Sequence, residues 1–102
     1  MDIRPHTNEN QIRLELAGRF TFDDHKVFKI EVTRAIGIPG TRRIVLDMTG
    51  LNYIDSSALG ALLLMKEHAE AAGVTLSISH PNHSVLKILK VVNFDKVFDL
   101  ME

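Results

Sequence analysis

The sequence predicts an α/β fold in which a mixed β-sheet packs against helices. Several short segments alternate apolar and polar residues, which is the pattern of half-buried strands. Another segment is a nearly continuous apolar run, as expected of a central strand. Between these lie segments with apolar residues at helical spacing. The order strand, strand, helix, strand, helix, strand, helix over 102 residues therefore predicts one domain spanning 1–102.

The first two elements are predicted to be strands. Residues 12–17 alternate Ile and Leu with other side chains, and Gly18 is expected to end that strand. A shorter strand around Ile3 precedes it, and residues 8–10 form the turn between the two. We expect these strands to pair.

The next element is predicted to be a helix over residues 22–36. Thr21 and Asp24 have the spacing of a capping box, and the acids that follow Phe22 suit the positive end of a helix. Glycine and proline at 37–40 end the helix. Its core face is expected to carry Phe28, Val32 and Ile36.

The central strand is predicted at residues 44–48, covered on both faces because its apolar run is broken only by Asp47. A short loop follows. Residues 57–72 then read as a helix that Gly73 terminates.

The last third of the chain predicts a strand, a helix and a short tail. Residues 74–79 alternate as a strand does, and Pro81 and Asn82 introduce the helix. Residues 94–100 are expected to form a short strand or turn. The apolar stripe of the helix comprises Val85, Ile88, Leu89 and Val92.

Composition and charge exclude several function classes. The formal net charge is -1 and the basic residues are scattered among acids, so we expect no direct nucleic-acid partner. The absence of cysteine excludes disulfides, thiolate zinc sites and cysteine nucleophiles. The first ten residues contain no apolar run, which argues against a signal peptide or a membrane span. We expect a cytoplasmic protein that does not associate with membranes.

Motifs for catalysis and for cofactors are missing from the sequence. No serine lies in a Gly-x-Ser-x-Gly elbow, and no glycine-rich loop of the nucleotide-hydrolase type occurs. His80 and His83 lack a third nearby metal ligand, and Pro81 breaks their helical spacing. We therefore expect no enzyme, no bound metal and no cofactor.

Asp55, Ser56 and Ser57 stand where the central strand gives way to a helix. A helix start has unpaired backbone N–H groups, and a phosphate there would find donors and a favourable dipole. Phosphorylation would add about -1.5 to -2 charges at this point. The same three residue types are also preferred as ordinary N-caps. Residue chemistry alone leaves both interpretations open.

The segment Asp47–Gly60 resembles the signature of the STAS family. In that family a strand ending in an apolar-Asp-apolar pattern leads through a short loop to Asp-Ser-Ser/Thr-Gly-Leu-Gly at a helix start. Here residues 55–60 read Asp-Ser-Ser-Ala-Leu-Gly. The resemblance extends over residues 12–98, with the predicted elements in the family's order.

This resemblance implies an anti-sigma factor antagonist that works by partner switching. The unphosphorylated protein is expected to bind an anti-sigma factor that is also a serine kinase. That kinase would switch binding off by phosphorylating Ser56, the serine directly after the aspartate, and a serine phosphatase would restore it. Ser57 would help to cap the helix. The domain would then be a substrate and a ligand, and a monomer when free.

The expected partner surface surrounds this motif. Ala58 stands where the family usually has glycine, which predicts a methyl group beside the acceptor. The family has a Gly-Glu-Leu-Asp turn before the first helix, and residues 18–21 here read Gly-Arg-Phe-Thr. Thr21 thus replaces an acid, and Asp23 or Asp24 is expected to supply that carboxylate. Leu64 is a hypothesised contact because its helix is apolar all round. The predicted partner-binding residues are Asp55, Ser57, Ala58, Gly60, Leu64, Thr21, Asp23 and Asp24.

Two alternatives remain open from the sequence. A STAS interaction subunit of a transporter, stress or other signalling assembly would use the same surface without phosphorylation. A nucleotide-binding regulator would hold a phosphate at the helix start without a covalent step.

Overall fold

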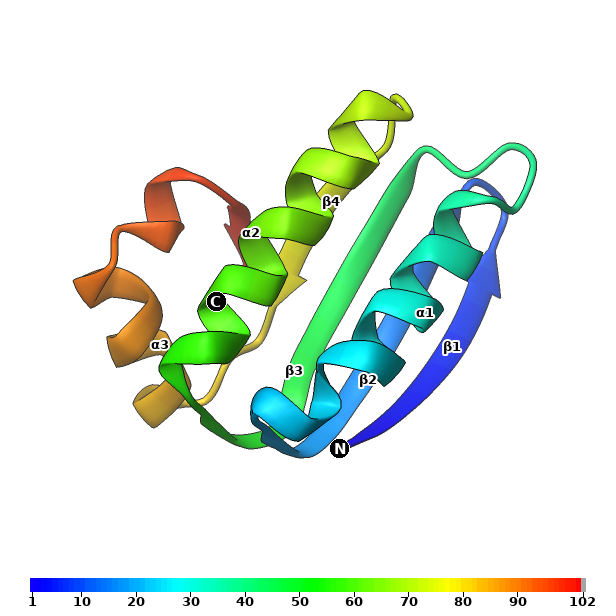
Figure 1. Cartoon of the computed structure of the whole chain (residues 1–102). Helices are drawn as coiled ribbons and strands as arrows, with labels where there is room; N and C mark the ends of the chain where they lie inside the picture. The colour runs from blue at the N-terminus through cyan, green and yellow to red at the C-terminus, as the bar shows by residue number, and fades with distance from the viewer. Residues whose placement is uncertain (102) are drawn as a thin grey trace.

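The computed structural model describes residues 1–101, and its centre is a sheet with the strand order β1-β2-β3-β4-β5 (Figure 1). β1 pairs with β2 in antiparallel fashion and the other neighbours pair in parallel. The predicted α/β fold with a mixed sheet is therefore confirmed. The strands are β1 Asp2–Asn8, β2 Gln11–Phe20, β3 Arg43–Ile54, β4 Thr75–Ser79 and β5 Asp99–Met101. The helices are α1 His25–Ile36, α2 Ser56–Ala71 and α3 His83–Val91, and short 3-10 turns occur at η1 Phe22–Asp24 and η2 Phe94–Lys96.

The hydrophobic core lies between the sheet and the helices. α1 and α2 lie side by side across one face of the sheet, and α3 lies beyond α2 (Figure 1). Leu14 of β2 stands opposite Leu46 of β3, and both are fully buried beneath the helices. Residues from all three helices join one hydrophobic cluster with the strands.

β2 and β3 are both longer than the sequence predicted. Gly18 does not end β2: its φ of +95° lies next to a register shift, and the strand continues to Phe20. The expected loop after residue 48 is strand as well, because Leu51 and Ile54 are buried and pair with this extension. A Cβ at Gly50 would lie 3.2 Å from that of Ala17, so glycine permits the close approach.

The helices differ from the prediction mainly at their ends. The first begins as the 3-10 turn η1, and α1 starts only at His25. Ala35 lies in its core face, while Ile36 is only partly buried. α3 ends at Val91, which leaves Val92 exposed and outside the predicted apolar stripe. Gly73 follows α2 with a φ of +76°, as expected of its terminating glycine.

The opposite face of the sheet has no helix over it in the described residues. Residues 44–48 are all buried, so the predicted cover on both faces of this strand is confirmed, but on this face charged side chains supply it. Arg13 donates to Asp47 at 2.8 Å and to Glu15 at 3.1 Å. Arg43 donates to Asp99 at 2.7 Å, reaching from β3 to β5.

Candidate functional site

Asp55 is the N-cap of α2 and joins two helix starts. Its Oδ1 accepts the backbone N–H of Ala58 at 2.9 Å and the hydroxyl of Ser57 at 2.7 Å. Its Oδ2 accepts the backbone N–H of Phe22 at 3.1 Å, the first residue of η1. One carboxylate therefore ties the beginning of α2 to the segment that leads into α1.

These donors also fix the charge of the Asp55 side chain. The hydroxyl of Ser57 and then the N–H groups of Ala58 and Phe22 lower the pKa of Asp55 below its usual value. The carboxylate is accordingly ionised at neutral pH. The start of α2 thus already holds one anion in its N-cap position.

The two serines after Asp55 have different environments. Ser56 is the first residue of α2, one residue earlier than predicted, and its exposed hydroxyl makes no hydrogen bond within residues 1–101. Ser57 is half-buried, and its hydroxyl donates to Asp55 rather than accepting a backbone N–H. Ser57 supports the cap through Asp55 and does not cap the helix itself. Of these two serines, only Ser56 has a hydroxyl without a hydrogen-bond partner in the described part of the chain.

Ala58 does not place its methyl group on the surface beside Ser56, although the sequence predicts it there. Its side chain is fully buried, so the methyl group belongs to the core and does not lie exposed beside Ser56. Gly60, one turn along the helix from Ser56, is exposed, and a Cβ there would meet no atom within 4 Å. Glycine at position 60 leaves open space on the surface of α2.

The aspartates near Thr21 have separate roles. Asp24 Oδ2 accepts the backbone N–H of Thr21 at 2.9 Å, and its Oδ1 accepts the terminal ammonium of Met1 at 2.9 Å. Burial raises the pKa of Asp24, but the Thr21 N–H and the ammonium outweigh burial, so the net shift is downward. Asp23 is exposed. Asp24 therefore holds the turn together, while Asp23 can meet a partner.

A groove runs between α1 and α2 and reaches the candidate site. Its volume is about 350 Å³ and Ser57 lies among its lining residues. Leu64, a predicted contact, is 54% exposed and lines the same groove. The sequence did not indicate His25 or Lys29, because they come from α1 and only the packing of the helices brings them here. The lining consists of His25, Phe28, Lys29, Ser57, Gly60, Ala61, Leu64 and Met65.

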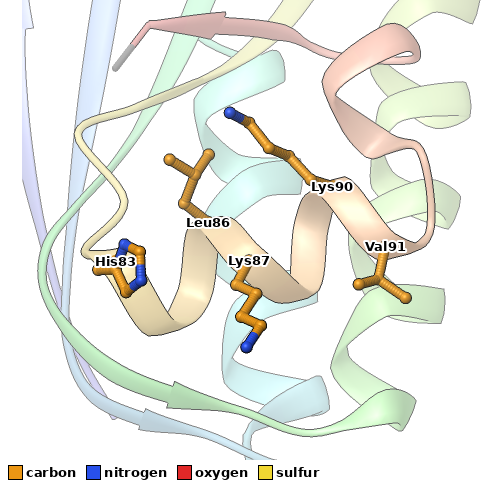
Figure 2. A pocket seen from close by; sticks show the side chains of 5 residues that line it. All are labelled: His83, Leu86, Lys87, Lys90 and Val91. Atoms are coloured by element: carbon orange, nitrogen blue, oxygen red, sulfur yellow. The ribbon is translucent and has the colours of Figure 1, made fainter.

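Two further hollows lie away from Ser56. One, of about 560 Å³, follows the outer side of α3, where Leu86 and Val91 lie among basic side chains (Figure 2). Another, of about 550 Å³, lies over the charged face of the sheet beside Arg13 and Asp47. Residues 1–101 contain no group of three or more histidine or carboxylate side chains placed to hold a metal ion. No helix in this part of the chain has the length and apolar character to cross a membrane.

Comparisons with known proteins agree on one family. Residues 3–102 match the family described as "Mlab, STAS domain". A STAS-domain containing protein of Pseudomonas aeruginosa is 34% identical over 96 residues, which cover 94% of this chain and 93% of that protein.

Solved structures share the fold at lower identity. A putative anti-sigma factor antagonist from Thermotoga maritima has a TM-score of 0.86 and 18% identity, with 98% of this chain and 86% of that one covered. The Bacillus cell fate determinant SpoIIAA in its phosphorylated form has a TM-score of 0.73 and 15% identity, with 99% and 92% covered. The fold, the match over nearly the whole chain and the Pseudomonas relative together show that this chain belongs to the STAS domain family.

Proposed function

We propose that this chain is an anti-sigma factor antagonist whose binding is switched off by phosphorylation of Ser56. The observation that carries the proposal is the contrast between the two serines. Ser56 is exposed and its hydroxyl has no hydrogen-bond partner among residues 1–101, whereas the hydroxyl of Ser57 donates to Asp55 at 2.7 Å. A kinase that approaches the start of α2 meets one available acceptor.

Phosphorylation at this position would change the surface more than the fold. It adds about -1.5 to -2 charges to a chain whose formal charge is -1. The N-cap position is already filled by Asp55, so the phosphate would project outward and repel that carboxylate. A partner that docks around Ser56 in the unphosphorylated state would therefore lose affinity.

The proposed partners are an anti-sigma factor that acts as a serine kinase and a serine phosphatase that reverses its action. Support comes from the fold shared with the putative Thermotoga antagonist and with SpoIIAA, which is named an anti-sigma factor antagonist, and from the Asp-Ser-Ser motif at 55–57. In this proposal the domain is the substrate and ligand of those proteins, without catalysis of its own.

Phosphotransfer to purified variants tests the switch. Wild type, Ser56→Ala and Ser57→Ala are incubated with candidate anti-sigma serine kinases and ATP, and the modified residue is located by mass spectrometry. We expect one phosphate on wild type and on Ser57→Ala and none on Ser56→Ala. Labelling that persists in Ser56→Ala, or no labelling by any candidate kinase, would contradict the switch.

Pull-down experiments address the partner. Ser56→Ala should retain the anti-sigma factor and Ser56→Asp should lose it, because only the latter carries a negative charge at the site. Equal capture by both variants would favour a STAS subunit of another assembly, which binds without a phosphorylation switch.

A further inference from the structure

The groove between α1 and α2 has a positive rim. The ionisable residues of its lining are His25 and Lys29, and no acid lines it. Lys29 is exposed and makes no ion pair within residues 1–101. Lys26 adds a further cation to the first turn of α1, and Glu31, the acid of this helix, pairs with Arg34 at 2.9 Å. The ionised Asp55 accepts a hydrogen bond from the lining residue Ser57, so the positive charge of the groove is carried by its α1 wall.

The floor of the groove is apolar. Phe28 and Met65 belong to the core and are 0% and 2% exposed, while Leu64 projects at the rim. Gly60 carries no side chain and leaves its part of the wall open. A helix whose apolar side chains repeat at three- and four-residue intervals has the shape and polarity for such a groove.

His25 and Lys29 of α1 line the groove one helical turn apart. The Nε2 atom of His25 is buried without a hydrogen-bond partner among the described residues, and the centroid of its ring lies 5.2 Å from that of Phe22. Because that atom is buried, a docked group cannot bond it directly, and His25 contributes to the wall of the groove. The exposed ammonium of Lys29 is the donor that a docked carboxylate can reach.

We propose that this groove binds an acidic amphipathic helix of a partner protein. Apolar side chains of that helix pack against Leu64 above the floor formed by Phe28 and Met65, and a carboxylate on its edge pairs with the ammonium of Lys29. The outer side of α3 in Figure 2 also combines apolar and basic residues. It is formed by one helix and offers no second wall, so it lacks the shape that supports the α1–α2 groove.

The groove also gives a physical route for the switch, and this part rests on the proposed function. Ser57 lines the groove, so its neighbour Ser56 lies next to that end. A phosphate on Ser56 places negative charge near the acidic helix and reduces its affinity by repulsion.

A pair of synthetic peptides tests the chemistry of the occupant. Each is about 14 residues, or roughly four helical turns, with the same leucine stripe, and the flanking positions are glutamate in one and lysine in the other. Binding to the full chain is followed by amide chemical shifts in NMR. We expect the glutamate peptide to shift the signals of Lys29, Gly60 and Leu64 and the lysine peptide to leave them unchanged.

Charge reversal provides the matched control. Lys29→Glu should weaken binding of the glutamate peptide about fivefold or more, whereas Lys87→Glu, the same change on α3, should alter it by less than about twofold. The proposal is overturned if neither peptide binds, if the lysine peptide binds equally well, or if both variants lose the same affinity. Phosphotransfer to Ser56 is measured separately, so a failed groove and a failed switch give different results.

Discussion

Single carboxylates and amides hold the ends of the elements together. Asn82 accepts the N–H of Val85 at 2.9 Å as the N-cap of α3, and its Nδ2 donates to the carbonyl of Leu51 at 2.9 Å. Asp55 does the same for α2 and η1. Each side chain bonds a backbone N–H group at the start of its own helix and a backbone group of a segment that is distant in sequence.

Replacing Asn82 tests this double role. Asn82→Ala removes an N-cap and leaves the Leu51 carbonyl without its donor, so the free energy of unfolding should fall by about 1 to 2 kcal/mol. Urea denaturation followed by circular dichroism gives the value. Asn52→Ala, a change at an exposed residue of β3, serves as the control and should remain within about 0.5 kcal/mol of wild type. An equal loss of unfolding free energy in both variants would contradict the stabilising hydrogen bonds assigned to Asn82.

The sequence predicts these caps but not the hydrogen bonds that their side chains form with distant segments. Residue preference identifies Asp55 and Asn82 as caps, because that choice is local. The bond from Asp55 to Phe22 spans 33 positions and the bond from Asn82 to Leu51 spans 31. Such contacts depend on how the strands pair, and no local pattern contains that information. For the same reason His25 and Lys29 were not predicted beside the site.

At the scale of elements, α2 shows how a helix that is apolar all round divides its leucines. Leu62 is fully buried, whereas Leu64 is 54% exposed and lines the groove. Helical spacing places Leu64 near the opposite face from Leu62, and the exposure of Leu64 agrees with that; its contact with a partner stays a prediction. The extra exposed leucine is consistent with the proposed docking of a partner on this helix.

The two leucines should respond differently to truncation. Leu62→Ala leaves a cavity in the core and should lower the free energy of unfolding by about 2 to 5 kcal/mol. Leu64→Ala removes exposed surface and should change it by about 0.5 kcal/mol or less. Thermal or urea unfolding of both variants measures the difference. A loss for Leu64→Ala comparable with that for Leu62→Ala would place Leu64 in the core.

The strands show where sequence patterns are informative and where they are not. The alternation of residues 12–17 gave the correct buried face of β2, because a period of two is a local property. The sequence predicts a loop where β3 continues through Leu51 to Ile54, since these apolar residues are three apart and match no strand pattern. Their burial comes from pairing with the end of β2, which includes the bulge near Gly18.

Across the whole molecule, three aspartates have pKa values below the usual one because donors in the fold bond their carboxylates. Burial raises the pKa of Asp47, but hydrogen bonds from Thr49 and from Arg13 outweigh it and the net shift is downward. The pKa values of Asp24 and Asp55 are lowered too. Each of these groups binds its proton less readily in the folded chain than in the unfolded one.

Stability should therefore fall in acid. A carboxylate with a lowered folded pKa contributes stability above its unfolded pKa, near 3.8, and that contribution is lost as the pH falls toward the folded value. Urea unfolding at a series of pH values from about 6 down to about 2.5 measures the slope.

Asp47→Asn provides the comparison for this experiment. The variant should be less stable at neutral pH and should show a shallower decline in acid, because the titrating group is gone. Asp2→Asn, at an exposed residue of β1, is the control and should follow wild type. If the free energy of unfolding changed with pH equally in wild type and Asp47→Asn, Asp47 would not contribute to the loss of stability in acid.

The hydrogen bond from Phe22 to Asp55 has a consequence for how the proposed kinase would recognise Ser56. A short peptide copied from residues 52–60 contains the acceptor serine but lacks Phe22, so its aspartate loses one of the donors that orient it. The local sequence then no longer carries the shape that surrounds the serine in the intact domain. Under the proposed switch, a kinase for Ser56 would meet a three-dimensional epitope assembled from two distant stretches of chain, and it would select the folded surface rather than a linear consensus.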